Sequence, residues 1–302
     1  MEKTNQDFTH VTADTAVSSV INNPAFNGFG QFIFPIKNCI DKYDSNMRIG
    51  NINSLLPYHN NYVNANTTVN VINYFLDEVK SGKTIFYNFY SDTQRQNDKN
   101  KESTGLFFFR GNPGAPFAVI CAGGGFSYVG SIHESFPYTI ELSKKGYNAF
   151  SIEYRVGGGG QAATEDLAAV ISFIFKTAAE LDIGVNNYSV WGASAGAKIT
   201  ANVGSNGVQA YGGDDVQKPC VVIMQYGNSG YTRDDPPTFA VVGESDSFSS
   251  FMKERMNNLK NLGIDTEFHI YKDVRHGFGL GIGTSAEGWI NDAVKFWEKH
   301  IL

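Results

Sequence analysis

Cysteine is scarce in this chain, and neither long apolar runs nor clusters of basic residues occur in it. The three cysteines, Cys39, Cys121 and Cys220, are widely spaced and show no metal-ligand spacing. We therefore expect buried free thiols in a reducing compartment, with Cys121 and Cys220 inside core strands, rather than a disulfide framework. No motif calls for a metal ion or an organic cofactor, so none is expected.

The charge balance narrows the range of partners. The chain carries 24 Lys and Arg against 30 Asp and Glu, a net charge of −6, and it has no extended basic run. Nucleic acid and anionic membrane surfaces are therefore not expected as partners. No stretch approaches the roughly 20 apolar residues of a membrane-spanning helix. The polar start, Met1 to Asp7, lacks the regions of a secretory signal, which favours a cytoplasmic protein unless a leader has been removed.

The chain of 302 residues, 42% of them hydrophobic, is long enough for one α/β domain with an N-terminal extension. From residue 83 onward, apolar runs typical of strands alternate with amphipathic patterns typical of helices. This alternation predicts a mostly parallel sheet covered by helices on both faces, with a ligand site at the carboxyl ends of the strands. Strands are expected at 83–90, 105–110, 116–122, 149–155, 219–226, 237–246 and 266–271, and a further strand is expected to end at Ser194. Helices are expected at 68–81, 133–145 and 163–181, and a last helix after a capping box of Thr284 and Glu287.

A Gly-x-Ser-x-Gly pentapeptide, Gly192 to Gly196, follows one of these apolar runs and precedes a helix-compatible segment. A sharp strand-to-helix turn would hold the Ser194 hydroxyl clear of its own backbone, where a histidine could take its proton. The small neighbours allow such a turn, and Ala195 leaves its amide free to face a substrate oxygen. A glycine-rich chain produces this pentapeptide by chance in roughly one case of four or five, so the prediction depends on the rest of the sequence.

Two further groups follow in the order that a serine nucleophile requires. Asp246 ends a buried strand, and His276 lies in the loop after the strand 266–271. The order Ser, Asp, His is that of α/β-hydrolases and differs from the orders in chymotrypsin-type and subtilisin-type proteases. Rival candidates are His269 for the base, although it lies inside an alternating strand, and several acids for the third position: Glu244, Asp234, Asp235 and Asp273. Of these, Asp273 is close to the histidine in the chain, which is unusual for its partner.

An upstream apolar strand at 116–122 runs into Gly123, Gly124 and Gly125. Successive glycines let backbone N–H groups approach a developing oxyanion without side chains in the way. With these three motifs, residues 83–302 resemble the esterases and lipases of the α/β-hydrolase superfamily, and in particular are similar to acetyl, acetylxylan and feruloyl esterases and hormone-sensitive-lipase-like enzymes. Many of those enzymes carry His-Gly-Gly-Gly, whereas this chain has Ala122 in place of the His, so support for the loop must come from elsewhere.

The resemblance implies an α/β-hydrolase fold and a carboxylic-ester hydrolase that acts on a small ester, of short-chain or acetyl type, through an acyl-enzyme. The residues implied are the nucleophile, the base, the acid and the three amide donors of an oxyanion hole: Ser194, His276, Asp246, and Gly124, Gly125 and Ala195. A serine peptidase or an acyltransferase could use the same residues. A ligand-binding protein on a hydrolase scaffold is a further alternative. The sequence gives neither the acyl and alcohol groups nor the oligomeric state.

Residues 1–82 match no motif. They are rich in Asn and aromatic residues and too apolar for a disordered tail, so they are expected to pack on the body. Two arrangements are open: a cap that shapes the active site, or a brace along the edge of the sheet.

Two polar pairs have alternative interpretations. His133 and Glu134 either orient the glycine loop or begin a solvated helix, because acids favour the first helical turn. Arg155 and Asp166 are expected to form a structural ion pair that anchors the loop 157–160. The four glycines of that loop lack the spacing of a phosphate-binding motif.

Overall fold

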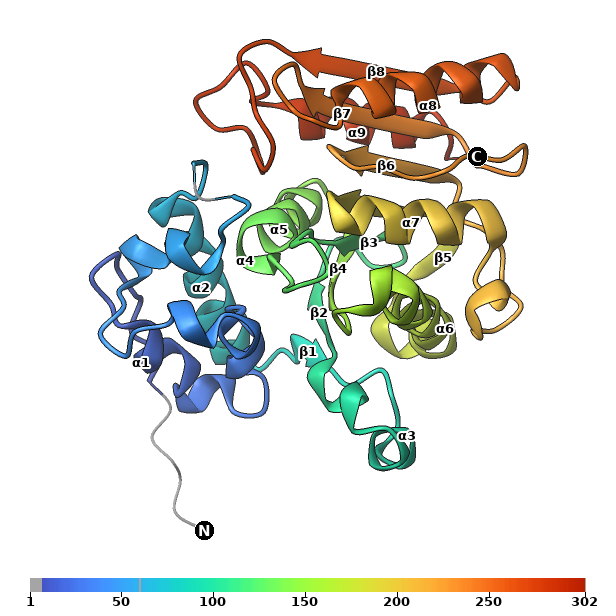
Figure 1. The fold of residues 1–302 in the computed structure, drawn as a ribbon. Coiled ribbons are helices and arrows are strands. Elements are labelled where there is room, and N and C mark those ends of the chain that lie inside the picture. Colours follow the sequence, from blue (N-terminus) through green and yellow to red (C-terminus); the bar gives the residue numbers. More distant parts are fainter. Residues whose placement is uncertain (1–6, 60, 302) are drawn as a thin grey trace.

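The computed structural model describes residues 7–59 and 61–301, and a single sheet of eight strands forms its centre (Figure 1). The strand order is β1-β2-β4-β3-β5-β6-β7-β8. The pairs β1–β2 and β2–β4 are antiparallel and all other neighbouring pairs are parallel, so the mostly parallel sheet expected from the sequence is confirmed. The strands are β1 Phe86–Tyr87, β2 Gly105–Phe109, β3 Pro116–Cys121, β4 Asn148–Glu153, β5 Gly184–Ala193, β6 Val221–Gln225, β7 Thr238–Gly243 and β8 Thr266–Tyr271.

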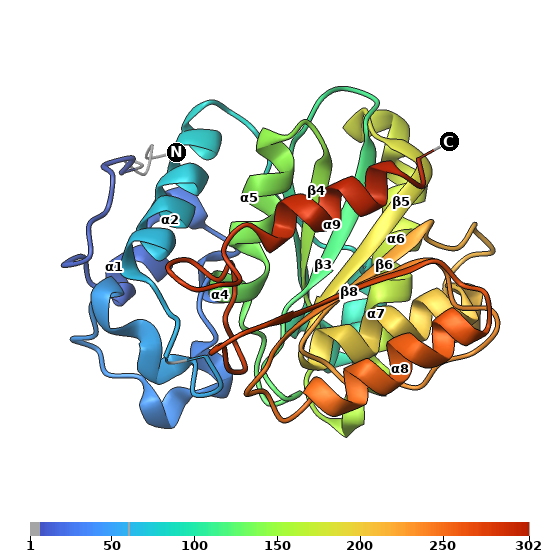
Figure 2. The ribbon, with the colours of Figure 1, turned by 90° about the horizontal axis from the view of Figure 1, so that it is seen from above.

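Helices cover both faces of the sheet (Figure 2). The connections β4 to β5, β5 to β6 and β7 to β8 all move in one direction along the sheet, so right-handed crossovers place α6, α7 and α8 on one face. The connection from β3 to β4 moves the other way and places α5 on the opposite face, where Tyr138 of α5 meets Trp289 of α9 edge-on. These helices are α4 Ser131–Glu134, α5 Phe136–Lys144, α6 Gln161–Leu181, α7 Ala195–Asn206, α8 Ser249–Asn261 and α9 Trp289–Glu298, and a short α3 Asp92–Asn97 precedes β2.

Burial explains why most strands could be located from the sequence. Every residue of β4, β6 and β7 is buried, and β6 and β7 have the mostly apolar sequences typical of strands that are covered on both faces. The edge strand β8 is only half-buried, and its sequence alternates instead. Because β3, β5, β7 and β8 are parallel, their carboxyl ends lie at the same edge of the sheet. The loops after these four ends carry the candidate site residues.

The N-terminal segment, which the structure describes over 7–59 and 61–82, forms a layer beside β1, β2 and α5 (Figure 1). Phe75 in this layer stacks on Phe107 of β2 with ring centroids 5.3 Å apart and meets Phe136 of α5 edge-on at 5.2 Å. Phe29 stacks on Phe86 of β1 at 5.3 Å. Most of the segment therefore braces the flank of the sheet. It contains α1 Val17–Ile21, α2 Ala65–Lys80 and short 3-10 turns at Pro24–Phe26, Gly30–Phe32, Ile36–Asn38, Ile40–Lys42 and Ile49–Leu55.

The predicted capping box at the start of the last helix is wrong. The helix α9 begins after Gly288, whose φ of 91° is left-handed. The Thr284 hydroxyl accepts a hydrogen bond from the Ala286 amide, and the Glu287 carboxylate accepts one from the Gly283 amide. Both side chains therefore stabilise the turn that precedes the helix.

Other local predictions need smaller corrections. The strand expected at 83–90 is reduced to Phe86–Tyr87, and the helix expected at 133–145 is broken at Ser135 into α4 and α5. Cys39 and Cys121 are buried free thiols, whereas Cys220 is half-buried and precedes β6 by one residue. Helix α8 has no counterpart among the predictions. Among the described residues, no helix is long and apolar enough to cross a membrane.

Candidate active site

Ser194 sits on a strained turn between β5 and α7. Its φ of 51° and ψ of −116° lie in a region that residues other than glycine rarely adopt, which is typical of a nucleophile elbow. The turn is tight enough to require glycine on both sides. A Cβ on Gly192 would lie 2.3 Å from the Gly196 carbonyl oxygen, and a Cβ on Gly196 would lie 2.0 Å from that of Cys121.

The structure brings Ser194, His276 and Asp246 into one hydrogen-bonded row. The distance from Ser194 Oγ to His276 Nε2 is 2.9 Å, and the distance from His276 Nδ1 to Asp246 Oδ2 is 2.8 Å. Asp246 lies in the loop after β7, where its other oxygen accepts a hydrogen bond from the Phe248 amide. His276 lies in the loop after β8. The row joins three loops at the carboxyl ends of parallel strands, as the sequence predicts for a site of this fold.

The rival residues lie elsewhere or have other partners. His269 contacts Glu267 within β8, at 2.7 Å. Among the acids, Asp235 is buried against Arg255 at 2.6 Å and also accepts from Ser205. The remaining rival acids are exposed: Glu244, Asp234 and Asp273.

The surroundings of His276 stabilise its protonated form, compared with a free histidine in water. Burial alone lowers the pKa of this imidazole, but the hydrogen bond to Asp246 and the negative charges of Asp246 and Glu134 outweigh burial. The pKa of His276 is therefore raised above its ordinary value of 6.5. The site stabilises an imidazolium, the form that a base acquires after taking a serine proton.

The glycine loop after β3 presents free amides close to Ser194. A Cβ on Gly123 would lie 2.7 Å from the Ser194 Cβ, so only glycine allows this approach. The amides of Gly124 and Gly125 have no hydrogen-bond acceptor within the part of the chain that the structure describes, and φ is positive at both residues. The amide of Ala195 is the first in α7 and has no intrahelical acceptor. These are the three donors predicted for an oxyanion hole.

A buried carboxylate is hydrogen-bonded to the first amide of the glycine loop. Glu134 is fully buried, and its Oε2 accepts a hydrogen bond of 2.6 Å from the Gly123 amide. Its Oε1 accepts one of 2.6 Å from Tyr226 and lies 2.8 Å from His59 Nε2. Burial alone would raise the pKa of Glu134, but the charge and hydrogen bond of His59 and the hydrogen bond from Tyr226 lower it to about 2. Of the two interpretations of Glu134, the structure therefore supports the one in which it orients the loop.

The same cluster reaches the loop that carries His276. The Tyr226 hydroxyl accepts a hydrogen bond from the Gly279 amide at 3.1 Å. Burial and the neighbouring His59 lower the pKa of His133 to about 4, so its neutral ring donates from Nε2 to the Gly277 carbonyl at 2.9 Å. The loops on both sides of Ser194 are thus fixed to one buried polar cluster.

Sequence reasoning missed His59. It comes from the N-terminal segment and is 1% exposed, and its Nδ1 lies 3.0 Å from the Tyr128 hydroxyl. A polar residue next to the apolar run Leu55–Leu56 is a weak signal, and nothing in the sequence pairs it with Glu134. His59 nevertheless supplies support for the glycine loop in a chain that has Ala122 where related enzymes have histidine.

A cleft of about 560 Å³ opens beside Ser194. Its lining residues are Gly125, Phe126, Ser194, Ala195, Lys198, Asn228, Ser229, Gly230 and Phe248. None of them comes from the described N-terminal ranges 7–59 and 61–82. The N-terminal segment meets the rim through Tyr58, whose ring would lie 3.0 Å from a Cβ on Gly125 and stacks on Tyr128 at 5.8 Å. These contacts support a role for residues near Tyr58 at the rim, while most of the segment braces the sheet.

Arg155, Asp166 and the glycines of the loop 157–160, which the sequence analysis also named, have structural contacts. Arg155 pairs with the buried Asp166 at 2.8 Å, as expected, and the Gly157 amide donates to the Phe126 carbonyl. The loop 157–160 has positive φ at all four glycines. Within the described ranges, no group of three or more His, Cys, Asp or Glu side chains could hold a metal ion.

Comparisons with known proteins bear on the fold and on part of the chain around Ser194. Residues 110–218 match the BD-FAE family model, an esterase-like domain; the match includes the glycine loop and Ser194 and ends before Asp246. No curated relative matches the chain. The likeness to solved structures shows that the chain has the α/β-hydrolase fold, as its sequence predicts.

Three of these structures illustrate the likeness, and each matches about two thirds of the chain. MGS-M1, an α/β-hydrolase enzyme from a Medee basin deep-sea metagenome library, is 20% identical over 66% of this chain and 93% of its own, with a TM-score of 0.57. The acetyl ester-xyloside bifunctional hydrolase from Caldicellulosiruptor lactoaceticus is 21% identical over 65% and 88%, with a TM-score of 0.57. The carboxylesterase Cest-2923 from Lactobacillus plantarum is 17% identical over 65% and 92%, with a TM-score of 0.57.

Proposed function

We propose that this chain is a serine carboxylic-ester hydrolase that works through an acyl-enzyme. The observation that carries the proposal is the hydrogen-bonded row of Ser194, His276 and Asp246 beside the free amides of Gly124 and Gly125. The α/β-hydrolase fold and the similarity to carboxylesterases support the same reaction. Fold alone would not, because the same scaffold serves many chemistries.

In the proposed mechanism, His276 Nε2 accepts the Ser194 proton as Oγ attacks the ester carbonyl. The amides of Gly124, Gly125 and Ala195 bind the resulting oxyanion. The imidazolium then gives its proton to the leaving alcohol, and a water molecule repeats the sequence on the acyl-enzyme. Asp246 accepts from His276 Nδ1, which keeps the ring in the tautomer whose Nε2 can act as base.

Short acyl groups are the proposed substrates. The cleft has the size of an ordinary small-molecule site, and Phe126 and Phe248 supply its aromatic lining. The similarity to a hydrolase of acetyl esters is consistent with this choice.

The test is a panel of p-nitrophenyl esters of increasing acyl length, together with acetylated sugars and feruloyl esters. We expect turnover that is fastest for short acyl groups, an initial burst of p-nitrophenol and labelling of one serine by a fluorophosphonate probe. Stoichiometric binding of an ester without release of p-nitrophenol would instead identify a ligand-binding protein.

The pH dependence of the reaction follows from the raised pKa of His276. Because the imidazole acts as base only when it is neutral, kcat/KM for a neutral ester should rise with pH through one ionisation. We expect the midpoint to lie above the ordinary value of 6.5, with a plateau at alkaline pH. Initial rates measured across this range check the prediction, and a flat profile from acid to neutral pH would rule out a histidine base.

Replacing the buried carboxylate should weaken catalysis without changing substrate contacts. In Glu134→Gln, one of the two oxygens that serve Gly123, Tyr226 and His59 becomes an amide donor, so the glycine loop loses part of its support. We expect kcat to fall by about 10²- to 10³-fold, the size of a lost oxyanion donor, with KM little changed. Steady-state kinetics, with circular dichroism to monitor folding, measure the effect.

Matched variants separate positioning from general destabilisation. Glu141→Gln changes a half-buried carboxylate on α5 that pairs with Lys144, outside the cluster, and should leave the rate unchanged. Tyr226→Phe removes the hydroxyl that donates to Glu134 and accepts from the Gly279 amide, but it leaves the carboxylate in place, so it should give a smaller loss of kcat even if Glu134→Gln folds poorly. Equal kcat values for Tyr226→Phe, folded Glu134→Gln and wild type would show that the cluster does not position the loop.

A further inference from the structure

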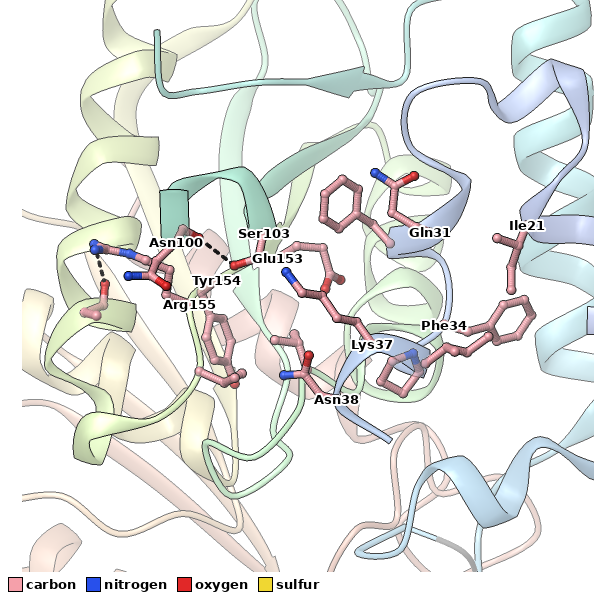
Figure 3. Close-up of a pocket in the computed structure, with 16 residues that line it drawn as sticks. Ile21, Gln31, Phe34, Lys37, Asn38, Asn100, Ser103, Glu153, Tyr154 and Arg155 are labelled. Atoms are coloured by element: carbon pink, nitrogen blue, oxygen red, sulfur yellow. Dashed lines mark hydrogen bonds between the residues drawn. The ribbon is translucent and has the colours of Figure 1, made fainter. Parts of the chain in front are cut away.

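A second and larger cavity lies between the N-terminal segment and the carboxyl end of β4 (Figure 3). Its volume is about 720 Å³, and it shares none of its sixteen lining residues with the cleft at Ser194. One wall comes from the residues around the 3-10 turns at Gly30–Phe32 and Ile36–Asn38, and the other from Asn100, Ser103 and residues 153–156. Nothing in the proposed hydrolysis uses this cavity.

Much of the lining is apolar and includes aromatic rings. Phe32, Phe34 and Ile36 come from the N-terminal segment, and Val129 and Val156 come from the body. Cavities of this size with apolar walls and a few polar groups are typical sites for small organic ligands. The walls therefore fit the ring of a small aromatic molecule.

The two cationic side chains of the cavity, Arg155 and Lys37, differ in their carboxylate partners. Arg155 is neutralised by Asp166 at 2.8 Å and by Asp98 at 3.3 Å. Lys37, in contrast, has no carboxylate within ion-pair distance among the described residues, and Figure 3 shows its side chain extending from the N-terminal segment into the cavity. Lys37 is therefore a cation available to a ligand.

Glu153, the last residue of β4, is an unusual lining residue. It is only 8% exposed, and its Oε1 has no hydrogen-bond partner among the described residues. Burial raises the pKa of its carboxyl to about 8, and Ser131 offsets this only in part. At neutral pH the group is therefore mostly an uncharged acid, which can donate a hydrogen bond. A buried carboxyl group with an unpaired oxygen is a candidate for a ligand contact.

We infer that this cavity binds a small aromatic carboxylate, whose ring packs against the apolar walls while its carboxylate pairs with Lys37 and accepts a hydrogen bond from the Glu153 acid. The charges favour this ligand over an organic amine, because Lys37 would repel an ammonium group and an uncharged Glu153 would not attract one. The site goes beyond the proposed ester hydrolysis and does not depend on Ser194.

The test is calorimetric titration of the full chain with 3-phenylpropanoate. The uncharged analogue 3-phenylpropanamide and the cationic analogue 3-phenylpropylamine serve as comparison ligands. We expect the carboxylate to bind most tightly at about pH 6.5 and to lose about ten-fold or more in affinity at about pH 9.5. Across this interval Arg155 stays charged, because burial is outweighed by its hydrogen bond and ion pair with Asp166, which raise its pKa, and Tyr154 stays protonated, because burial raises its pKa well above the usual range. The pKa of Glu153, about 8, lies inside the interval, so the charge of this lining group changes.

Three variants assign the site. Lys37→Met should weaken binding of the carboxylate by about two- to five-fold, the usual range for an ion pair with an exposed lysine. Glu153→Gln keeps a donor that does not titrate, so it should bind at pH 6.5 nearly as well as wild type and lose the decline at alkaline pH. Lys198→Met, which changes the lysine at the Ser194 cleft, should leave binding unchanged and is the matched control.

Several outcomes would overturn the inference. Tighter binding of the amine than of the carboxylate would show a cation site, and no binding of any of the three compounds would show that the cavity takes no aromatic ligand. A loss in Lys198→Met but not in Lys37→Met would place the ligand in the Ser194 cleft. An alkaline decline that persists in Glu153→Gln would exclude Glu153 from the site. None of these outcomes bears on ester hydrolysis, which the p-nitrophenyl esters test separately.

Discussion

Ser194→Ala is expected to lower kcat for ester hydrolysis by roughly 10⁶-fold, as when the serine of a triad is removed in other hydrolases. Only Oγ can form the acyl-enzyme, and the remaining oxyanion donors cannot replace it. The fold should be unaffected, because Ala tolerates the strained turn as well as Ser does and, among the described residues, the lost hydroxyl bonds only to His276. The measurement is single-turnover hydrolysis of a p-nitrophenyl ester, with circular dichroism as the check on folding.

A second serine in the same cleft provides the matched control. Ser229 lines the cleft but has no hydrogen bond to a histidine among the described residues, so Ser229→Ala should keep the rate within a few-fold of wild type. A fluorophosphonate should label wild type and Ser229→Ala at one site and leave Ser194→Ala unlabelled. Equal labelling of Ser194→Ala would mean that another residue is the nucleophile.

Asp246→Asn is expected to lower kcat by about 10⁴-fold. The side chain is buried and 2.8 Å from His276 Nδ1, so an amide there would present a donor and favour the tautomer that cannot accept the Ser194 proton. Because Asp246 also raises the pKa of His276, the residual activity should have its midpoint at lower pH than in wild type. Rate profiles of the two proteins measure both effects.

Asp273→Asn is the matched control for Asp246→Asn. Asp273 lies three residues from His276 in the chain, but it is exposed, and we expect its replacement to change the rate by less than about two-fold. A large loss in Asp273→Asn with little effect in Asp246→Asn would overturn the assignment of the acid while leaving the nucleophile in place.

Most strands, and the three side chains of the hydrogen-bonded row, could be located from the sequence because short local patterns specify their positions. The glycines around Ser194 are required because a Cβ on either would lie 2.0 to 2.3 Å from a backbone carbonyl oxygen, so the elbow can be recognised from the sequence. Asp246 and His276 could be placed because Asp246 follows an apolar strand and His276 an alternating one, and parallel strands bring their carboxyl ends to one edge.

The supporting cluster could be predicted only in part. Glu134 was one candidate for orienting the glycine loop, but its partners are distant in the chain and share no motif with it. His59 and Glu134 are 75 positions apart, yet they lie 2.8 Å from each other. Helix α8 was missed for a different reason: its buried face includes the charged Arg255 beside Met252, Met256 and Leu259, which weakens the apolar pattern. Arg255 is accommodated by Asp235, a contact that no local rule predicts.

The contacts of Tyr58, His59 and Tyr62 have a consequence for how the chain folds. The Tyr62 hydroxyl accepts a hydrogen bond of 2.8 Å from the Arg275 amide, 213 positions away, and a Cβ on Gly277 would touch the backbone of Tyr58. Joining such distant residues costs loop entropy, which is recovered only after the intervening sheet has formed. The loops around Ser194 should therefore reach their final geometry late, after both ends of the chain have docked. A folding intermediate with most of its helices and strands in place would still be inactive.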